Sequence, residues 1–194
     1  MNLEEYSFVQ AFAIVLWIMM PAYLANTIAV VAGGRFPIDQ GKKLRDGNRI
    51  LGDGKTWSGL AGGTLGGISV GYLQLNFGNS IIDAIAGTNR VPFWGDEPLL
   101  IFFLLAFGAL FGDLTASFFK RRQNLDRGEK HPLLDMYDFV AMSLFLTMIL
   151  GGGWIQSWIL DGIMPLFTIL IATPILHRGV NIIGFKMGIK NEPW

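Results

Sequence analysis

Five apolar segments constrain the fold of this chain of 194 residues more than any other feature. Each is close to the length of about 20 residues that an α-helix needs to cross the hydrocarbon core of a bilayer. Only 15% of the residues are charged, whereas an ordinary soluble domain has about 25%. The sequence therefore predicts an all-α integral membrane protein, one domain over residues 1–194. Its five transmembrane helices are expected at about residues 8–32, 58–75, 99–119, 133–153 and 155–176.

The basic residues predict how these spans are oriented. Of the 15 Lys and Arg residues, 14 fall in the segments 33–57, 120–132 and 177–194, and only Arg90 falls on the other side. Short loops that are rich in Lys and Arg stay in the cytoplasm. We therefore expect a multi-pass protein of the cell membrane, with the N-terminus outside, the C-terminus inside and these three segments cytoplasmic.

Glycines recur every four residues along the second span, at positions 59, 63, 67 and 71. They share one side of a helix, and small residues at this spacing let helices approach closely in lipid. The pattern fits two arrangements, tight packing within the chain or a homodimer, and it does not choose between them.

Three acidic residues lie where hydrophobicity alone would not place them. Asp113 is inside the third span, with Ser117 and Lys120 on the same helical face, and Asp135 and Asp138 share a face at the start of the fourth span. Acids inside a membrane are costly unless they are paired, hydrated or bound to a cation. A purely structural pairing of acids with Lys120 or Arg121 stays possible, but three acids from two helices favour a cation site.

The residue types favour magnesium and phosphate at such a site. The chain has no Cys and only two His, so zinc is poorly supplied with ligands. Carboxylate oxygens suit Mg²⁺, which proteins hold with one or two carboxylates plus the phosphates of a substrate.

The segment LGDGKTWSG (51–59) resembles a phosphate-binding P-loop, but Arg49 stands where that motif needs a glycine. Because no strand precedes it and a membrane span follows, a nucleoside triphosphatase fold is excluded. Lys55 and Thr56 are still candidate phosphate donors, since the start of the second span has unpaired helix N–H groups. The alternative is an ordinary turn that leads into a helix.

Residues 112–139, GDLTASFFKRRQNLDRGEKHPLLDMYDF, resemble the signature of the membrane CTP:phosphatidate cytidylyltransferases. The matching positions are Gly112-Asp113, Ser117, Lys120-Arg121, Asp135 and Asp138. The small size, Pro37-Ile38-Asp39 with GDGKTW, and the run from His177 through NIIGFKMGIKNEPW resemble the archaeal branch of that family, the CDP-archaeol synthases. His131-Pro132-Leu133-Leu134 takes the place of a glycine-rich stretch of the bacterial enzymes. The likeness covers essentially the whole chain.

The resemblance implies a CTP-dependent nucleotidyltransferase that acts on an unsaturated archaeal diether glycerol 1-phosphate and forms CDP-archaeol and pyrophosphate with Mg²⁺. It implies no nucleic-acid partner. We expect Asp113, Asp135 and Asp138 to hold one or two Mg²⁺ ions and Lys120 to act in catalysis. Further candidates for binding phosphates are Ser117 and Arg121 with Lys120 on one side, and Asp53, Lys55 and Thr56 on the other. Asn26 is a candidate contact to cytosine or ribose, and Lys43, Arg45 and His131 are weaker phosphate candidates.

Two alternatives remain. One is an enzyme like CDP-diacylglycerol synthase that uses another lipid phosphate. The other is a small ion or solute transporter with Asp113 in an ion path. Transporter sites tend to lie at the midplane between repeated halves, and the sequence shows no repeat and gathers its polar groups at one face.

Overall fold

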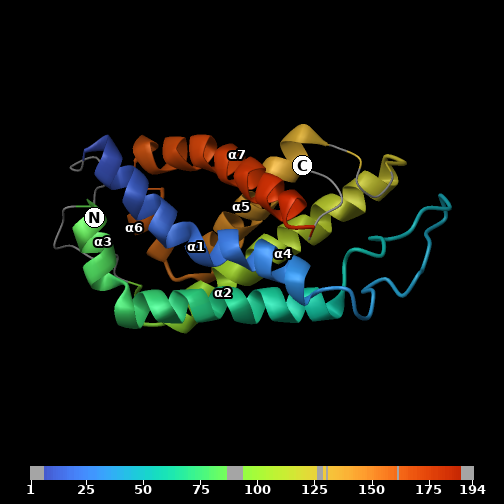
Figure 1. The fold of residues 1–194 in the computed structure, drawn as a ribbon, viewed down its shortest axis with the longest axis horizontal. Coiled ribbons are helices and arrows are strands. Elements are labelled where there is room, and N and C mark those ends of the chain that lie inside the picture. Colours follow the sequence, from blue (N-terminus) through green and yellow to red (C-terminus); the bar gives the residue numbers. More distant parts are fainter. Residues whose placement is uncertain (1–6, 87–93, 126–128, 130, 161, 189–194) are drawn as a thin grey trace.

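The computed structural model describes residues 7–86, 94–125, 129, 131–160 and 162–188 (Figure 1). Arg90, Arg127, Lys130 and Lys190, which count in the charge argument, lie outside the described residues. The described residues form seven α-helices and no β-sheet. The helices are α1 (Phe8–Ala32), α2 (Trp57–Phe77), α3 (Asn79–Ala86), α4 (Pro98–Arg122), α5 (Pro132–Leu150), α6 (Trp154–Trp158) and α7 (Ile163–Lys186). The prediction of an all-helical chain is confirmed.

Local signals set the starts of the long helices. A capping box at the start of α1 pairs the Ser7 hydroxyl with the N–H of Gln10, and the Gln10 side chain with the N–H of Ser7. Thr56 caps α2, because its hydroxyl accepts the N–H of Gly59 at 3.1 Å. Both α4 and α5 begin with a proline, whose missing N–H costs nothing in the first turn.

The fifth apolar segment differs from the prediction of one helix over about 155–176. It is divided into the short α6 and the long α7, which runs ten residues past 176 to Lys186. Gly152 and Gly153 adopt positive φ and turn the chain into α6, and Gly162 then has extended backbone at the start of α7. The side chains of Trp154, Ile155 and Trp158 are buried in the core. Because these residues pack in the interior, α7 begins after them.

Within the part of the chain that the structure describes, three helices, α1, α4 and α7, are long and apolar enough to cross a membrane, and α2 and α5 are not among them. Many large apolar side chains are also exposed on the outside of the helices, such as Leu65, Phe77, Ile163 and Ile175. An exposed apolar surface of this extent fits contact with lipid. The chain is therefore a membrane protein.

The glycine face of α2 packs within the chain. A Cβ on Gly63 would lie 2.7 Å from the backbone oxygen of Ala25 on α1, and one on Gly71 would overlap the ring of Phe102 on α4. These glycines are buried, so α1 and α4 lie closer to α2 than larger side chains would allow. The pattern allowed packing within the chain or a homodimer. In the structure, this face of α2 packs against α1 and α4 of the same chain.

The same device joins α4 to α5. A Cβ on Gly108 would lie 2.7 Å from the Cα of Ser143, and one on Gly112 would overlap the backbone oxygen of Asp138. The helix residues that carry the predicted acids are therefore held close together. The loop from residue 33 to 56 extends from the end of the helices where α1 finishes and α2 begins, opposite α3 (Figure 1).

Candidate active site

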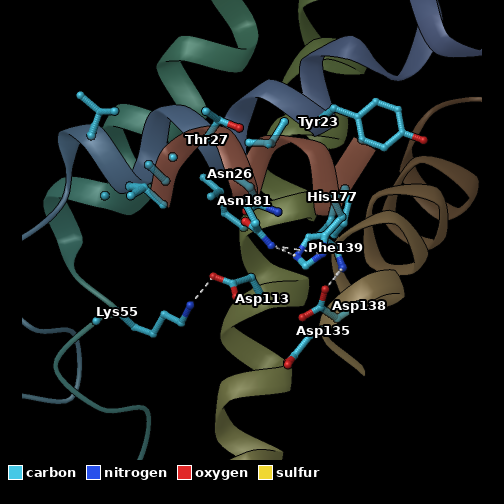
Figure 2. A pocket seen from close by; sticks show the side chains of 18 of the residues that line it. Tyr23, Asn26, Thr27, Lys55, Asp113, Asp135, Asp138, Phe139, His177 and Asn181 are labelled. Carbon is cyan, nitrogen blue, oxygen red and sulfur yellow. Dashed lines mark hydrogen bonds and ion pairs between the residues drawn. The ribbon is translucent and has the colours of Figure 1, made fainter. Parts of the chain in front are cut away.

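A pocket of about 320 Å³ lies where α1, α2, α4, α5 and α7 meet. Its polar lining contains Asp113, Asp135 and Asp138, and Figure 2 shows them on α4 and α5 with α1 and α7 across the pocket. Other polar residues that line it are Tyr23, Asn26, Thr27, Lys55, Thr56, His177 and Asn181. The three acids that the sequence singled out from two separate helices thus face one pocket.

Asp113 is paired with a lysine from the loop. The Nζ atom of Lys55 lies 2.5 Å from Oδ2 of Asp113, and Figure 2 shows this contact at one side of the pocket. The side chains are 25% and 37% exposed respectively, so the pair is open to a ligand. The lysine is therefore placed where it can neutralise a carboxylate or a phosphate.

Asp135 is bound at the start of α5. Lys120 Nζ lies 2.9 Å from Oδ1 and 3.1 Å from Oδ2 of Asp135, and the backbone N–H of His131 donates to Oδ2 at 2.9 Å. A carboxylate in the first turn of a helix also interacts favourably with the helix dipole. Asp135 therefore has a structural role in addition to its place on the pocket wall.

Among the described residues, Asp138 has no Lys or Arg side chain within ion-pair distance. Within the described residues, the hydrogen bond found for its carboxylate comes from the backbone N–H of Phe139, at 2.6 Å to Oδ1. The negative charges of Asp113 and Asp135 act on Asp138, as does the positive charge of Lys55. Two carboxylates that repel each other across a pocket are an arrangement that a cation would stabilise.

The donor set fits Mg²⁺ when substrate phosphates complete the coordination. Among the described residues no group of three His, Asp or Glu side chains is close enough to hold a metal by itself. Mg²⁺ does not require such a cage, since it keeps water molecules and phosphate oxygens beside one or two carboxylates. Asp113 and Asp138 are the residues of this pocket that suit that role.

The start of α2 differs from what the P-loop likeness suggested. The N–H of Trp57 donates to the backbone oxygen of Phe36 at 2.9 Å, and the N–H of Gly59 is taken by the Thr56 hydroxyl. These two N–H groups are therefore not available for phosphate. Lys55 and Thr56 do line the pocket, so it is the lysine side chain that can reach an anion.

Several other predicted residues lie outside the pocket wall. Asp53 is largely exposed and pairs with Arg49. The backbone of Lys43 pairs with that of Arg49 in the loop, and Arg45 is exposed nearby.

The predicted residues at the ends of α4 and α5 also lie outside the pocket wall. Ser117 is buried in α4. Nε of Arg121 and Nδ1 of His131 are buried and have no hydrogen-bond partner within the described part of the chain. Lys120 does not line the pocket, and its bonds to Asp135 connect it to the pocket wall.

Four polar pocket residues, Tyr23, Thr27, His177 and Asn181, were not candidates in the sequence. The Tyr23 hydroxyl is 3.0 Å from the hydroxyl of Thr173. Asn181 is buried, and its side-chain nitrogen lies 3.2 Å from Nε2 of His177 one turn earlier on α7. The His177 ring also stacks on Phe139 of α5. The spacing of four between His177 and Asn181 was the available signal, but it lay beyond the end predicted for the fifth span.

The whole chain is similar to proteins of one enzyme family. The family described as CarS-like, CDP-archaeol synthase, matches residues 8–194. The CDP-archaeol synthase of Methanospirillum hungatei is 46% identical over 176 residues, which cover 91% of this chain and 100% of that protein. The CDP-archaeol synthase of Methanosarcina barkeri is 44% identical over 178 residues, with 91% and 100% covered.

A solved structure, described as an intramembrane enzyme for archaeal membrane lipid biosynthesis, is also similar. It superposes with a TM-score of 0.63 at 35% identity and covers 86% of this chain and 92% of that one. The family match covers residues 8–194, and the structural similarity covers 86% of the chain. This chain therefore belongs to the CDP-archaeol synthase family.

Proposed function

We propose that this enzyme transfers CMP from CTP to an unsaturated archaeal diether glycerol 1-phosphate and forms CDP-archaeol and pyrophosphate. The observation that carries the proposal is the pocket in which Asp113 and Asp138 of α4 and α5 face Lys55 of the loop. This pocket offers carboxylates and an ammonium group to phosphates and opens among apolar helices. The lipid chains can therefore stay in the bilayer while the headgroup reaches the polar residues.

In the reaction, an oxygen of the lipid phosphate attacks the α-phosphorus of CTP. The bond from that phosphorus to the bridging oxygen breaks, and pyrophosphate leaves with the electron pair. The lipid phosphate is already an anion, so the chain needs no strong general base. The main barriers are the repulsion between two polyanions and their orientation, which positioned cationic groups reduce.

The residues divide this work. Lys55, released from Asp113 or shared with it, can donate to a phosphate oxygen, and Lys120 holds Asp135 at the pocket wall. Asn26 and Asn181 offer amide groups that suit a cytosine or a ribose hydroxyl. Asp113 and Asp138, with Asp135 beside them, would hold Mg²⁺, which supplies positive charge against the phosphates when it is bound.

We propose that five helices, α1, α2, α4, α5 and α7, cross the membrane, with the N-terminus outside and the pocket at the cytoplasmic side. The distribution of Lys and Arg supports this orientation. The chain has no Cys, so single Cys substitutions can report it. An impermeant maleimide added to intact cells should label an Asp96→Cys variant and spare a Phe36→Cys variant, and the reverse pattern would contradict the orientation.

Incubation of the purified protein with labelled CTP, the archaeal lipid phosphate and Mg²⁺ tests the activity. The label should enter lipid with release of pyrophosphate, and EDTA should abolish transfer. An Asp135→Asn or Asp138→Asn variant should lose transfer while it stays folded, and an Asp96→Asn variant should keep it. Equal rates with a diacyl lipid phosphate would favour a CDP-diacylglycerol synthase-like enzyme, and no transfer by folded protein would favour transport.

A further inference from the structure

The loop between α1 and α2 contains a buried acid that lies outside the pocket. Asp39 is the charged residue that is buried among the described residues, and its side chain is 0% exposed. A carboxylate in such a position is strongly destabilising unless hydrogen bonds satisfy it. The contacts of Asp39 therefore indicate what its burial accomplishes.

Asp39 accepts five hydrogen bonds. Two come from the guanidinium of Arg49, with Nε 3.1 Å from Oδ2 and Nη2 bound to Oδ1. The other three come from the backbone N–H groups of Gly41, Leu51 and Gly52, at 3.1, 3.1 and 2.9 Å. The Arg49 guanidinium, together with these N–H groups, holds the pKa of Asp39 well below its usual range.

These bonds join two stretches of the loop, residues 39–41 and 49–52. The second stretch leads directly to Lys55. The N–H of Lys55 donates to the oxygen of Gly52 at 3.3 Å, and the oxygen of Lys55 accepts the N–H of Ile38 at 2.9 Å. The backbone of Lys55 is thus held on one side by Gly52, which Asp39 binds, and on the other by Ile38, the neighbour of Asp39.

Lys55 then reaches from this backbone to Asp113 in the pocket. A flexible lysine side chain can occupy many positions, and its amine is useful to a reaction only when the backbone presents it to the ligand. The two backbone hydrogen bonds of Lys55 therefore connect it to the two stretches of the loop that Asp39 joins, while the bond from Trp57 N–H to Phe36 holds the start of α2 just after it.

We propose that Asp39 and Arg49 form a clamp that positions Lys55 toward the pocket, so that Asp39 is a positioning residue of the CMP transfer although it touches no substrate. The inference rests on the proposed function for its kinetic consequences. The task proposed for the buried Asp39 carboxylate is to hold the backbone of Lys55. The pocket acids Asp113, Asp135 and Asp138 do not perform this task.

Activity gives the first test. An Asp39→Asn variant keeps the size of the side chain but loses the charge that binds Arg49. Its kcat for CDP-lipid formation should fall by about 10- to 100-fold, the range expected when a reacting group is misplaced by about 1 Å. Asp96→Asn is the control, since Asp96 is an exposed acid outside this loop. Equal losses in the two variants, or no loss in Asp39→Asn, would overturn the clamp.

A double-mutant cycle separates positioning from general damage. If Asp39 acts through Lys55, then Asp39→Asn in a Lys55→Ala background should lower kcat by less than a further factor of about 2, because the two changes remove one function. A multiplied loss would mean that Asp39 acts independently of Lys55.

Lysine reactivity tests the clamp without the reaction. With an amine-acylating reagent and mass spectrometry, Lys55, whose side chain is 25% exposed, should react more slowly than the exposed Lys42 in the native protein. The Asp39→Asn variant should bring the rate of Lys55 toward that of Lys42, and Asp96→Asn should not. An unchanged Lys55 rate in Asp39→Asn would refute the clamp even if the protein makes CDP-archaeol.

This labelling also distinguishes the two proposals. If the native protein forms no CDP-lipid but its Lys55 reactivity follows Asp39 as described, the clamp stands and the proposed function fails. If Asp39→Asn does not fold, Arg49→Lys serves in the same assays, since it keeps the charge and loses the two-pronged bond to the carboxylate. It should produce the same directions of change.

Discussion

The ammonium group of Lys55 lies 2.5 Å from the carboxylate of Asp113 and joins the loop before α2 to the C-terminal half of α4, across 58 positions of the sequence. Both residues line the pocket. The ion pair therefore brings the glycine-rich loop, which resembles a phosphate-binding motif, to the acids of the membrane helices.

Removal of the lysine amine should impair catalysis more than folding. In a Lys55→Gln variant we expect kcat for CMP transfer to fall by about 100-fold or more, the loss typical of removing one donor that stabilises charge in the transition state. Lys55→Arg should keep part of the activity because it keeps the charge. Lys42→Gln, an exposed change in the same loop, is the control. Wild-type kcat in Lys55→Gln would exclude the lysine from the reaction.

The close approach of α4 and α5 should be necessary for activity. In a Gly112→Ala variant the new Cβ would lie 2.8 Å from the backbone carbon of Asp138 and overlap its oxygen, and a backbone cannot rotate away. The two helices must separate, which moves Asp138 relative to Asp113, and a shift of about 1 Å can cost about 100-fold in rate. Transfer per folded protein is the measurement, and full activity would show that this spacing is not needed.

The glycine face of α2 should determine stability. A Cβ on Gly67 would lie 2.7 Å from the backbone oxygen of Pro21 and overlap the side chain of Ala106, so Gly67→Ala should destabilise the protein by about 1–3 kcal/mol. Gly179→Ala on α7 is the matched control, since nothing lies within 4 Å of its Cβ, and it should be neutral or stabilising by up to about 1 kcal/mol. Thermal unfolding in detergent measures both. If Gly67→Ala has the same unfolding temperature as the native protein, the close contact is not required.

The clamp at Asp39 should give stability a defined pH dependence. Arg49 lowers the pKa of Asp39 in the folded protein below the ordinary carboxyl value of 3.8. A lowered pKa means that the ionised carboxylate stabilises the fold, that this contribution is complete above the ordinary pKa, and that it is lost as the pH falls through the folded-state value. The difference in unfolding temperature between the native protein and Asp39→Asn should therefore be constant from pH 7 to about 5 and shrink below about 4. A difference that disappears already between pH 7 and 5 would contradict this assignment.

Hydropathy and helix signals were sufficient to predict four of the long helices close to their observed bounds. They failed at the fifth segment, because the tryptophans of α6 are apolar whether they face lipid or the core. Only the packing of Trp94 against Trp154 and Phe102 shows that this stretch belongs to the interior and that α7 begins after it.

The acidic residues show the same difference between what the sequence predicts and what only the structure reveals. Asp113, Asp135 and Asp138 stand out in the sequence because a charge inside an apolar span is costly wherever it points, and they do line one pocket. Asp53 and Lys55 are two residues apart in one motif, yet Asp53 pairs with Arg49 at the surface while Lys55 reaches the pocket. No local pattern distinguishes them, since the direction of each side chain depends on the bonds that shape the loop.

The amino-acid order by itself determined which stretches are helical and apolar, where the glycines allow close approach, and which charges are too costly to lie in lipid without a task. These are properties of neighbouring residues and of their transfer from water. Only the tertiary structure decided that Lys55 meets Asp113, that Asp39 holds Arg49, and that His177 and Asn181 face the acids. Such pairs depend on how helices cross and how a loop folds back on itself, and these are set by the packing of the whole chain.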